Sequence, residues 1–174
     1  MVVLGIDPGL ARTGYGIIRQ EGERLLPLAY GCLETTAPLS PERRLLQLHQ
    51  ALAVLLQQYW PDYLALEALL FNRNARSALQ VGQARGVVLL AAAQAGVAVR
   101  EFNPLTVKQA VTGSGGAAKQ QVQRMVQTLL ALPKPPRPDD TADALAVAVC
   151  CLHHLTFEKA VGAHDRPSAR HPLE

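Results

Sequence analysis

The chain has 174 residues, of which 49% are hydrophobic and 18% are charged, and its formal net charge is +3. This composition is too apolar and too weakly charged for a disordered chain, and no apolar run approaches the roughly 18 residues that a membrane span needs. The charge is unevenly distributed, because residues 68–138 hold nine basic side chains and one acidic side chain, a net charge of +8. The segments before and after it carry −2 and −3, so a basic middle lies between two acidic ends.

The cellular compartment is predicted from the first residues and from the cysteines. Residues 1–7 reach an acidic side chain without a basic segment, which is not the pattern of a signal peptide. Three cysteines, with Cys150 and Cys151 adjacent, do not form a disulfide framework. We therefore expect a reduced, cytoplasmic environment.

The first third of the chain predicts three strands with short connections. Residues 2–6 form a β-branched apolar run that ends at the turn Asp7-Pro8-Gly9. Residues 14–20 and 25–35 are the next two strands, separated by a turn near residues 21–23. This order predicts an antiparallel meander.

Helices and strands alternate in the rest of the chain. Ser40 as N-cap and Pro41 at the first helical position predict a helix that ends near Tyr59. The later expected elements are a strand at 63–66, a helix at 75–95, a strand at 97–102, a short helix from Pro104, and helices at 117–130 and 139–155. We expect one α/β domain over residues 1–157, a mixed five-stranded sheet with helices on both faces, followed by a disordered tail at 158–174.

Acidic residues stand at the ends of apolar elements. Asp7 follows one buried strand and Glu67 follows another, while Asp140 and Asp143 lie one turn apart at the start of an apolar helix. If the two strands are adjacent and parallel, Asp7 and Glu67 project at the same edge of the sheet, where ligands of open α/β sheets bind. Four carboxylates at one place suit Mg²⁺ or Mn²⁺, since these hard cations prefer oxygen ligands. Two such ions can support cleavage of a phosphodiester.

Each acid also has a simpler interpretation. Asp7 could stabilise the turn with Pro8 and Gly9, and Glu67 could pair with a nearby arginine. Asp139 or Asp140 could be an ordinary helix N-cap.

Several sequence blocks occur together in the order of a known family. Leu4-Gly5-Ile6-Asp7-Pro8-Gly9 and Thr13-Gly14-Tyr15-Gly16 resemble the opening of the RuvC-type Holliday-junction resolvases (crossover junction endodeoxyribonucleases). Other blocks similar to that family are residues 61–67, 77–79, 82–86 and 107–109, and the D-x-x-D-A-L-A helix start at 140–146. The resemblance covers about residues 1–155.

This resemblance implies a ribonuclease-H-like fold, a homodimer, and nicking of two symmetric strands of a four-way DNA junction during homologous recombination and DNA repair. It implies that Mg²⁺ or Mn²⁺, with two ions per active site, is held by Asp7, Glu67, Asp140 and Asp143 as metal-binding catalytic acids. It also implies a branch-migration helicase complex as a partner. No membrane association is expected.

The DNA-contacting residues are predicted partly from the resemblance and partly from charge. Lys108 and Lys119 match basic family positions that face DNA phosphates. Charge alone adds Arg73, Arg76 and Arg124, which could equally be solvated surface residues. The family places an apolar or aromatic side chain near the junction centre after the second acid, and here Leu70 and Phe71 are the alternatives for this wedge, unless they pack in the core or dimer.

Other functions are weighed against this one. A related nuclease could act on RNA or on other branched DNA. An actin-like ATPase or sugar kinase also begins with a strand and a D-x-G turn, but it needs two such domains and leaves Asp140 and Asp143 unexplained. A junction-binding module without catalysis is the third alternative.

Overall fold

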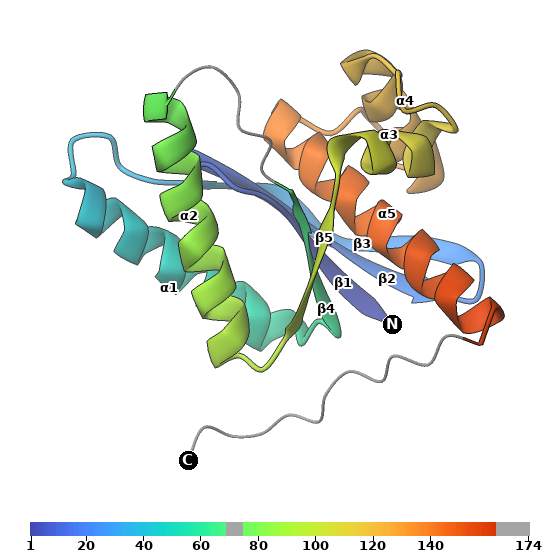
Figure 1. Cartoon of the computed structure of the whole chain (residues 1–174), viewed down its shortest axis with the longest axis horizontal. Helices are drawn as coiled ribbons and strands as arrows, with labels where there is room; N and C mark the ends of the chain where they lie inside the picture. The colour runs from blue at the N-terminus through green and yellow to red at the C-terminus, as the bar shows by residue number, and fades with distance from the viewer. Residues whose placement is uncertain (69–74, 163–174) are drawn as a thin grey trace.

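The centre of the structure is a five-stranded mixed sheet with the strand order β3-β2-β1-β4-β5 (Figure 1). The strands are β1 (Val2–Asp7), β2 (Arg12–Glu21), β3 (Arg24–Glu34), β4 (Tyr63–Glu67) and β5 (Ala98–Phe102). The first three are antiparallel neighbours, whereas β4 pairs in parallel with both β1 and β5. The computed structural model describes residues 1–68 and 75–162. The predicted ribonuclease-H-like sheet with an antiparallel beginning is confirmed.

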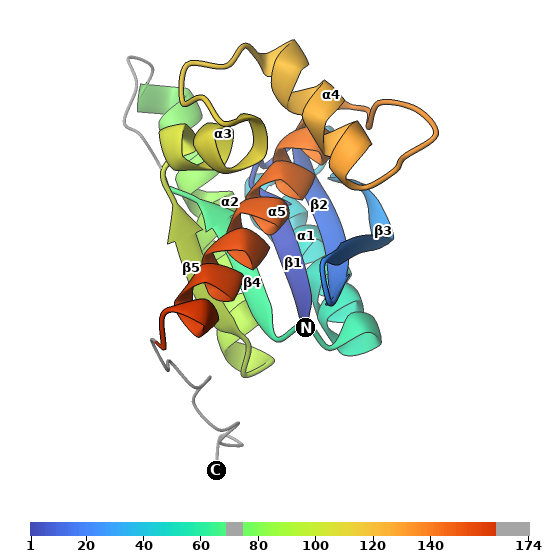
Figure 2. The same cartoon turned by 90° about the vertical axis from the view of Figure 1, so that its right-hand side faces the viewer.

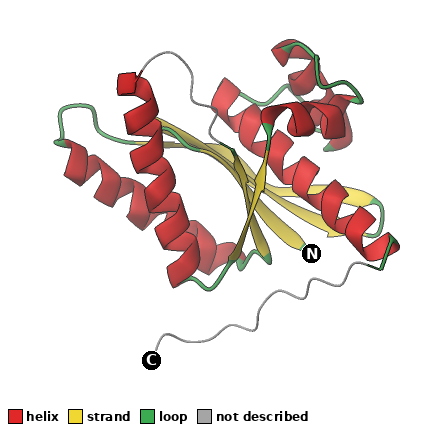
Figure 3. Cartoon of the chain, viewed as in Figure 1, coloured by secondary structure: helices red, strands yellow, loops and turns green. Residues whose placement is uncertain are grey.

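Helices cover both faces of this sheet (Figure 3). Helices α1 (Pro41–Tyr59) and α2 (Ala75–Gln94) lie on one face, and α3 (Pro104–Thr112), α4 (Lys119–Leu129) and α5 (Asp139–Ala160) lie on the other. Side chains alternate along each strand, so the sheet builds two cores. Leu4, Ile6 and Leu64 pack against α1 and α2, while Val3 and Ala65 pack against α5.

Helix α5 lies unusually close to the sheet because glycines occupy the positions beneath it. A side chain at Gly5 would collide with the main-chain oxygen of Ala144, and one at Gly14 would collide with the main-chain oxygen of Asp140. Gly16 would likewise meet the side chain of Leu145. Figure 2 shows α5 crossing the sheet with α3 and α4 beside its N-terminal half. The sequence at these strand positions therefore sets how near the acidic start of α5 comes to β1.

The last helix is longer than predicted. It continues to Ala160, past the expected end at Leu155 and past the domain boundary at residue 157. Thr156 donates a hydrogen bond to the main-chain oxygen of Leu152 at 2.8 Å, and Lys159 in the last turn is favourably placed at the negative end of the helix. The polar residues from 158 onward predict a tail, but residues 158–160 form the last turn of the helix. Residues 163–174 of the predicted tail lie outside the described residues.

Two other elements begin at slightly different residues than predicted. Strand β2 begins at Arg12, two residues earlier than expected, and α4 begins at Lys119 with Ala118 as its N-cap. In the described part of the chain, no helix combines the length and apolarity needed to cross a membrane.

Replacing Gly5 tests the close packing of α5. Gly5→Ala should lower the free energy of unfolding by about 1–3 kcal/mol, because the added methyl group meets backbone atoms of Ala144 and Ala148 that are held in the core. Gly116→Ala is the control, since its methyl group would make only an ordinary contact with Ser114. Equilibrium unfolding in urea measures both. Equal stability of the two variants would contradict the packing constraint.

Candidate active site

Strand alternation and strand pairing bring Asp7 and Glu67 together. Asp7 shares its side of β1 with Val3 and Gly5, and Glu67 shares its side of β4 with Ala65, so both carboxylates point toward the face that α5 covers. The two strands are parallel and paired up to Ile6 and Leu66. Asp7 and Glu67 therefore end adjacent strands at the same edge of the sheet.

Helix α5 adds the other two acids to this edge. Asp7 is paired in register with Gly14, and Gly14 lies directly beneath the main chain of Asp140. Asp143 follows one turn later. The negative charges of Asp143, Glu67 and Asp140 all act on Asp7 and raise its pKa. The structure thus gathers all four acids predicted from the sequence.

Burial and the neighbouring negative charges raise the pKa values of three of the gathered carboxylates. Burial, followed by the charges of the three other acids, raises the pKa of Asp7 to about 7. Burial also raises the pKa of Glu67 and of Asp143, and Asp143 adds to the shift of Glu67. A set of acids that resists simultaneous ionisation is a site for a positive ligand.

Two basic side chains balance part of this charge. Lys119 Nζ lies 2.9 Å from Asp143 Oδ2, and Arg12 Nε lies 3.3 Å from Asp140 Oδ2. Burial works to lower the pKa of Lys119, but the hydrogen bond and charge of Asp143 outweigh it, so the pKa is raised. Cys32 Sγ also lies 3.9 Å from Asp140 Oδ2. The acids of α5 are therefore held by partners from α4, β2 and β3.

A cavity of about 280 Å³ opens beside the acids. It is lined by the acids Glu67 and Asp143, by the bases Lys108 and Lys119, and by apolar residues of α3, α4 and α5. Lys108 also acts on Glu67, whose pKa its charge lowers against the effect of burial. Acids that suit a metal ion and bases that suit a phosphate thus share one cavity.

The other predicted DNA contacts have different positions. Arg124 is exposed on the outer side of α4. Arg76 belongs to the first turn of α2, but its side chain is outside the described residues, as are Arg73, Leu70 and Phe71 entirely. Of the predicted DNA-contacting residues, the structure therefore places Lys108 and Lys119 beside the acids. Arg124 lies away from that cavity, and the remaining side chains are outside the described residues.

The oxygen-rich donor set fits a hard divalent cation such as Mg²⁺ or Mn²⁺. Over residues 1–68 and 75–162, no three His, Cys, Asp or Glu side chains converge closely enough to hold an ion as they stand. Asp140 and Asp143 are instead turned to Arg12 and Lys119. An ion held by all four acids would therefore compete with Arg12 and Lys119 for these two carboxylates.

The simpler interpretations of the acids are not supported. The turn after Asp7 is closed by Thr13, which donates to the main-chain oxygen of Gly9 at 2.8 Å. Arg85 donates to the main-chain oxygen of Glu67 at 3.0 Å and pairs through its guanidinium with Glu101. The N-cap of α5 is Pro138 rather than an aspartate.

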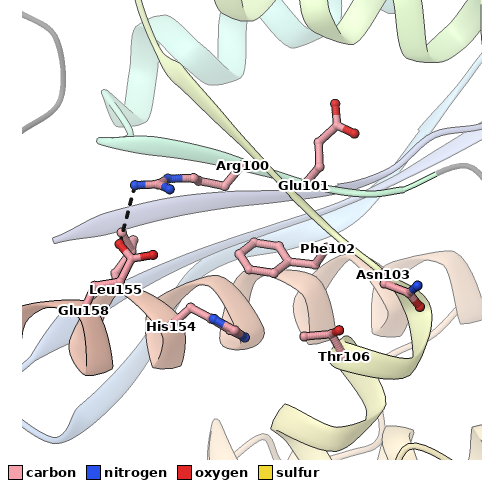
Figure 4. Close-up of a pocket in the computed structure, with 8 residues that line it drawn as sticks. All are labelled: Arg100, Glu101, Phe102, Asn103, Thr106, His154, Leu155 and Glu158. Carbon is pink, nitrogen blue, oxygen red and sulfur yellow. Dashed lines mark hydrogen bonds and ion pairs between the residues drawn. The ribbon is translucent and has the colours of Figure 1, made fainter. Parts of the chain in front are cut away.

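A second cavity, of about 330 Å³, lies between β5, the start of α3 and the C-terminal half of α5 (Figure 4). Its charges are already paired, because Arg100 lies 3.5 Å from Glu158 and over the ring of Tyr63. Phe102 and His154 pack with ring centroids 5.1 Å apart. This cavity is thus a neutralised and partly aromatic hollow, in contrast to the first.

Comparisons with known proteins identify the family of the chain. The family model described as crossover junction endodeoxyribonuclease RuvC matches residues 3–151. The chain belongs to the RuvC family. A RuvC from Heliobacterium modesticaldum is 57% identical over 157 residues, covering 90% of this chain and 97% of the relative. One from Desulforamulus reducens is 56% identical over 150 residues, covering 86% and 92%.

A solved RuvC structure extends the comparison to three dimensions. The structure of T. thermophilus RuvC in complex with Holliday junction substrate is 36% identical, with a TM-score of 0.86, and covers 90% of this chain and 96% of that chain. More distant Holliday junction resolvases share the fold, such as that of fowlpox virus at 16% identity and a TM-score of 0.56. The RuvC resemblance inferred from the sequence blocks is confirmed.

Sequence reasoning missed several residues at the RuvC site. Arg12 and Cys32 contact Asp140. Asp139 contacts Lys119, and Gln123 contacts Asp139. Arg12 lies in the acidic N-terminal segment, so a search for basic residues in the middle of the chain passed over it. Its place three residues after the Asp7-Pro8-Gly9 turn, at the start of a strand running back from the same edge, was the available signal.

The raised pKa of Asp7 predicts how stability depends on pH without metal. A carboxyl with a pKa of 3.8 when unfolded and about 7 when folded binds its proton more tightly in the folded state, so the free energy of unfolding falls as pH rises through this range. The loss is on the order of 4 kcal/mol at most. Asp7→Asn should therefore stabilise the protein at pH 8 in chelator, with a gain that shrinks toward pH 5. Urea unfolding at several pH values measures the free energy of unfolding of the wild type and of Asp7→Asn. A difference between the two proteins that stays constant with pH would contradict this prediction.

Proposed function

We propose that this chain is a structure-specific endonuclease that resolves four-way DNA junctions by metal-dependent, symmetric paired nicking during homologous recombination and DNA repair. The observation that carries the proposal is the meeting of Asp7, Glu67, Asp140 and Asp143, from three separate elements, beside a cavity lined by Lys108 and Lys119. Membership of the RuvC family supports it, as does the related structure with a Holliday junction substrate.

The four acids are the residues that would hold a divalent cation. Nucleases of this family depend on divalent metal ions in general, and the choice of Mg²⁺ or Mn²⁺ and the use of two ions are part of our proposal. Bound to these acids, such ions supply activation of water and stabilisation of the leaving oxygen. The chain itself places the four acidic residues at the ends of two strands and the start of a helix, so their main-chain positions are set before DNA arrives.

Basic residues around the acids position the DNA backbone. Lys108 and Lys119 line the cavity with Glu67 and Asp143, within reach of a phosphate that enters it. Arg124, Arg73 and Arg76 extend the proposed contact surface, and Leu70 or Phe71 is the proposed wedge at the junction centre. Contacts to phosphates set the register of DNA rather than its sequence.

A homodimer supplies the second cut, and α2 is the surface that we propose for it. Leu79, Leu89 and Leu90 are exposed on this helix, and Gly82 and Gly86 have open space above them. Leucines around two small residues one turn apart allow two helices to approach closely. A two-fold axis there would relate two active sites to the two equivalent strands of a junction. The branch-migration helicase partner and the cytoplasmic location remain predictions from the sequence.

Cleavage of defined DNA substrates tests the function. The wild type should nick a synthetic four-way junction symmetrically with Mg²⁺ or Mn²⁺, and should leave a linear duplex, an RNA–DNA hybrid and a chelator-treated junction uncut. Asp7→Asn should lose at least about 100-fold in nicking rate, because the acid cluster loses its central carboxylate, while retaining junction binding. Binding should weaken as salt rises.

Two results would overturn the proposal. One is nicking by Asp7→Asn at the wild-type rate. The other is faster cleavage of the hybrid than of the junction, which would favour a ribonuclease. Gel-shift titration of the same preparations shows whether binding is retained.

Substitution on α2 tests the dimer. Leu90→Glu should shift the protein to monomers in sedimentation experiments, since it places a charge in the proposed apolar contact. It should also convert paired cuts into single nicks. Phe157→Glu, an exposed apolar residue on α5 at the other face of the sheet, is the matched control. A Leu90→Glu protein that remains dimeric would exclude this surface.

A further inference from the structure

The first turns of α4 and α5 are joined by a network of four side chains. Lys119 and Gln123 lie one turn apart on α4, and Asp139 and Asp143 lie one turn apart on α5. Lys119 Nζ contacts both acids, at 2.9 Å from Asp143 Oδ2 and 3.4 Å from Asp139 Oδ2. Gln123 Nε2 donates to Asp139 Oδ1 at 2.8 Å. The ammonium of Lys119 is therefore held between two carboxylates of the same helix.

The two carboxylates differ in their surroundings. The side chain of Asp143 is 29% exposed and belongs to the acid cluster, whereas that of Asp139 is 55% exposed and lies on the solvent side of Lys119. Gln123 and Lys119 together fix both oxygens of Asp139, one by a hydrogen bond and one by the ion pair. Asp139 thus has two partners and neither belongs to the acid cluster.

We propose that Asp139 is a positioning residue that keeps the ammonium of Lys119 at the mouth of the acid cluster when Asp143 is engaged elsewhere. The inference rests on the proposed function, in which Asp143 holds a cation and Lys119 faces a phosphate. When Asp143 no longer pairs with Lys119, the lysine keeps one ion-pair partner among the described residues, Asp139. Asp139 is itself held in place by the hydrogen bond from Gln123. The alternative is an incidental surface ion pair of little consequence.

Asp139→Asn separates positioning from simple electrostatics. Removing a negative charge beside the DNA path should leave junction affinity unchanged or slightly increase it, because repulsion of phosphates falls. Loss of positioning should nevertheless slow single-turnover nicking by about tenfold, since small misplacements of a catalytic group are costly. Asp139→Glu keeps the charge and should recover most of the rate. Glu23→Gln, an exposed acid in the turn at the opposite edge of the sheet, removes the same charge and should cut normally.

A double-mutant cycle shows whether Asp139 acts through Lys119. In a Lys119→Ala background, Asp139→Asn should cause no further loss of nicking rate, because the group that it positions is gone. Thermal melting of each variant checks that it is folded, and Gln123→Ala should give a smaller loss than Asp139→Asn.

The outcomes distinguish this inference from the proposed function. If Lys119→Ala cuts slowly and Asp139→Asn cuts at the wild-type rate, the inference about Asp139 is wrong and the function stands. If Asp139→Asn slows cutting equally with and without Lys119, Asp139 acts by another route and the inference is also overturned. If Lys119→Ala cuts normally, the proposed role of Lys119 itself fails.

Discussion

The arrangement of the site depends on the close approach of α5 to the sheet. Gly5 and Gly14 leave no side chain between the strands and the main chain of the helix, so the helix start is pressed against the end of β1. A larger residue at either position would push Asp140 and Asp143 away from Asp7. Packing in the core and the geometry of the acid cluster are thus one constraint. The pKa values of Asp7 and Asp143, raised first by burial and then by the neighbouring acids, follow from it.

That constraint concentrates negative charge where little water remains to screen it. Repulsion of this kind costs stability, and the structure offsets part of it with two ion pairs that reach the cluster from different sides. Arg12 comes from the start of β2 and Lys119 from the start of α4. These ion pairs offset part of the repulsion around Asp7, whose pKa is raised to about 7 so that it holds its proton to about neutral pH.

Much of the fold and the main features of the site were predictable from the sequence. Strand alternation, turn residues and helix caps indicated the element order, and acids placed at the ends of apolar elements indicated the cluster. The contacts of Cys32 and Asp139 were not predictable, because each depends on how separate elements pack rather than on local spacing. The final turns of α5 were missed for a related reason: Thr156 and Lys159 have polar side chains, and only the tertiary position of the helix shows that they form its solvent-facing side.

The topology of the fold brings the acidic ends of the chain and its basic middle to one place. The N-terminal segment supplies Asp7 and Glu67 at the ends of the neighbouring strands β1 and β4. The C-terminal segment supplies Asp140 and Asp143 at the start of α5, which packs on these strands. The basic middle supplies α3 and α4, which lie beside the start of that helix, so Lys108 and Lys119 surround the acids instead of neutralising the chain evenly. The net charge of +3 therefore does not show that a half-buried acidic centre lies beside a basic rim. An approaching phosphate backbone meets the basic rim before it meets the acidic centre. The local arrangement of charges, rather than the net charge of the chain, therefore decides that this face attracts an anionic ligand.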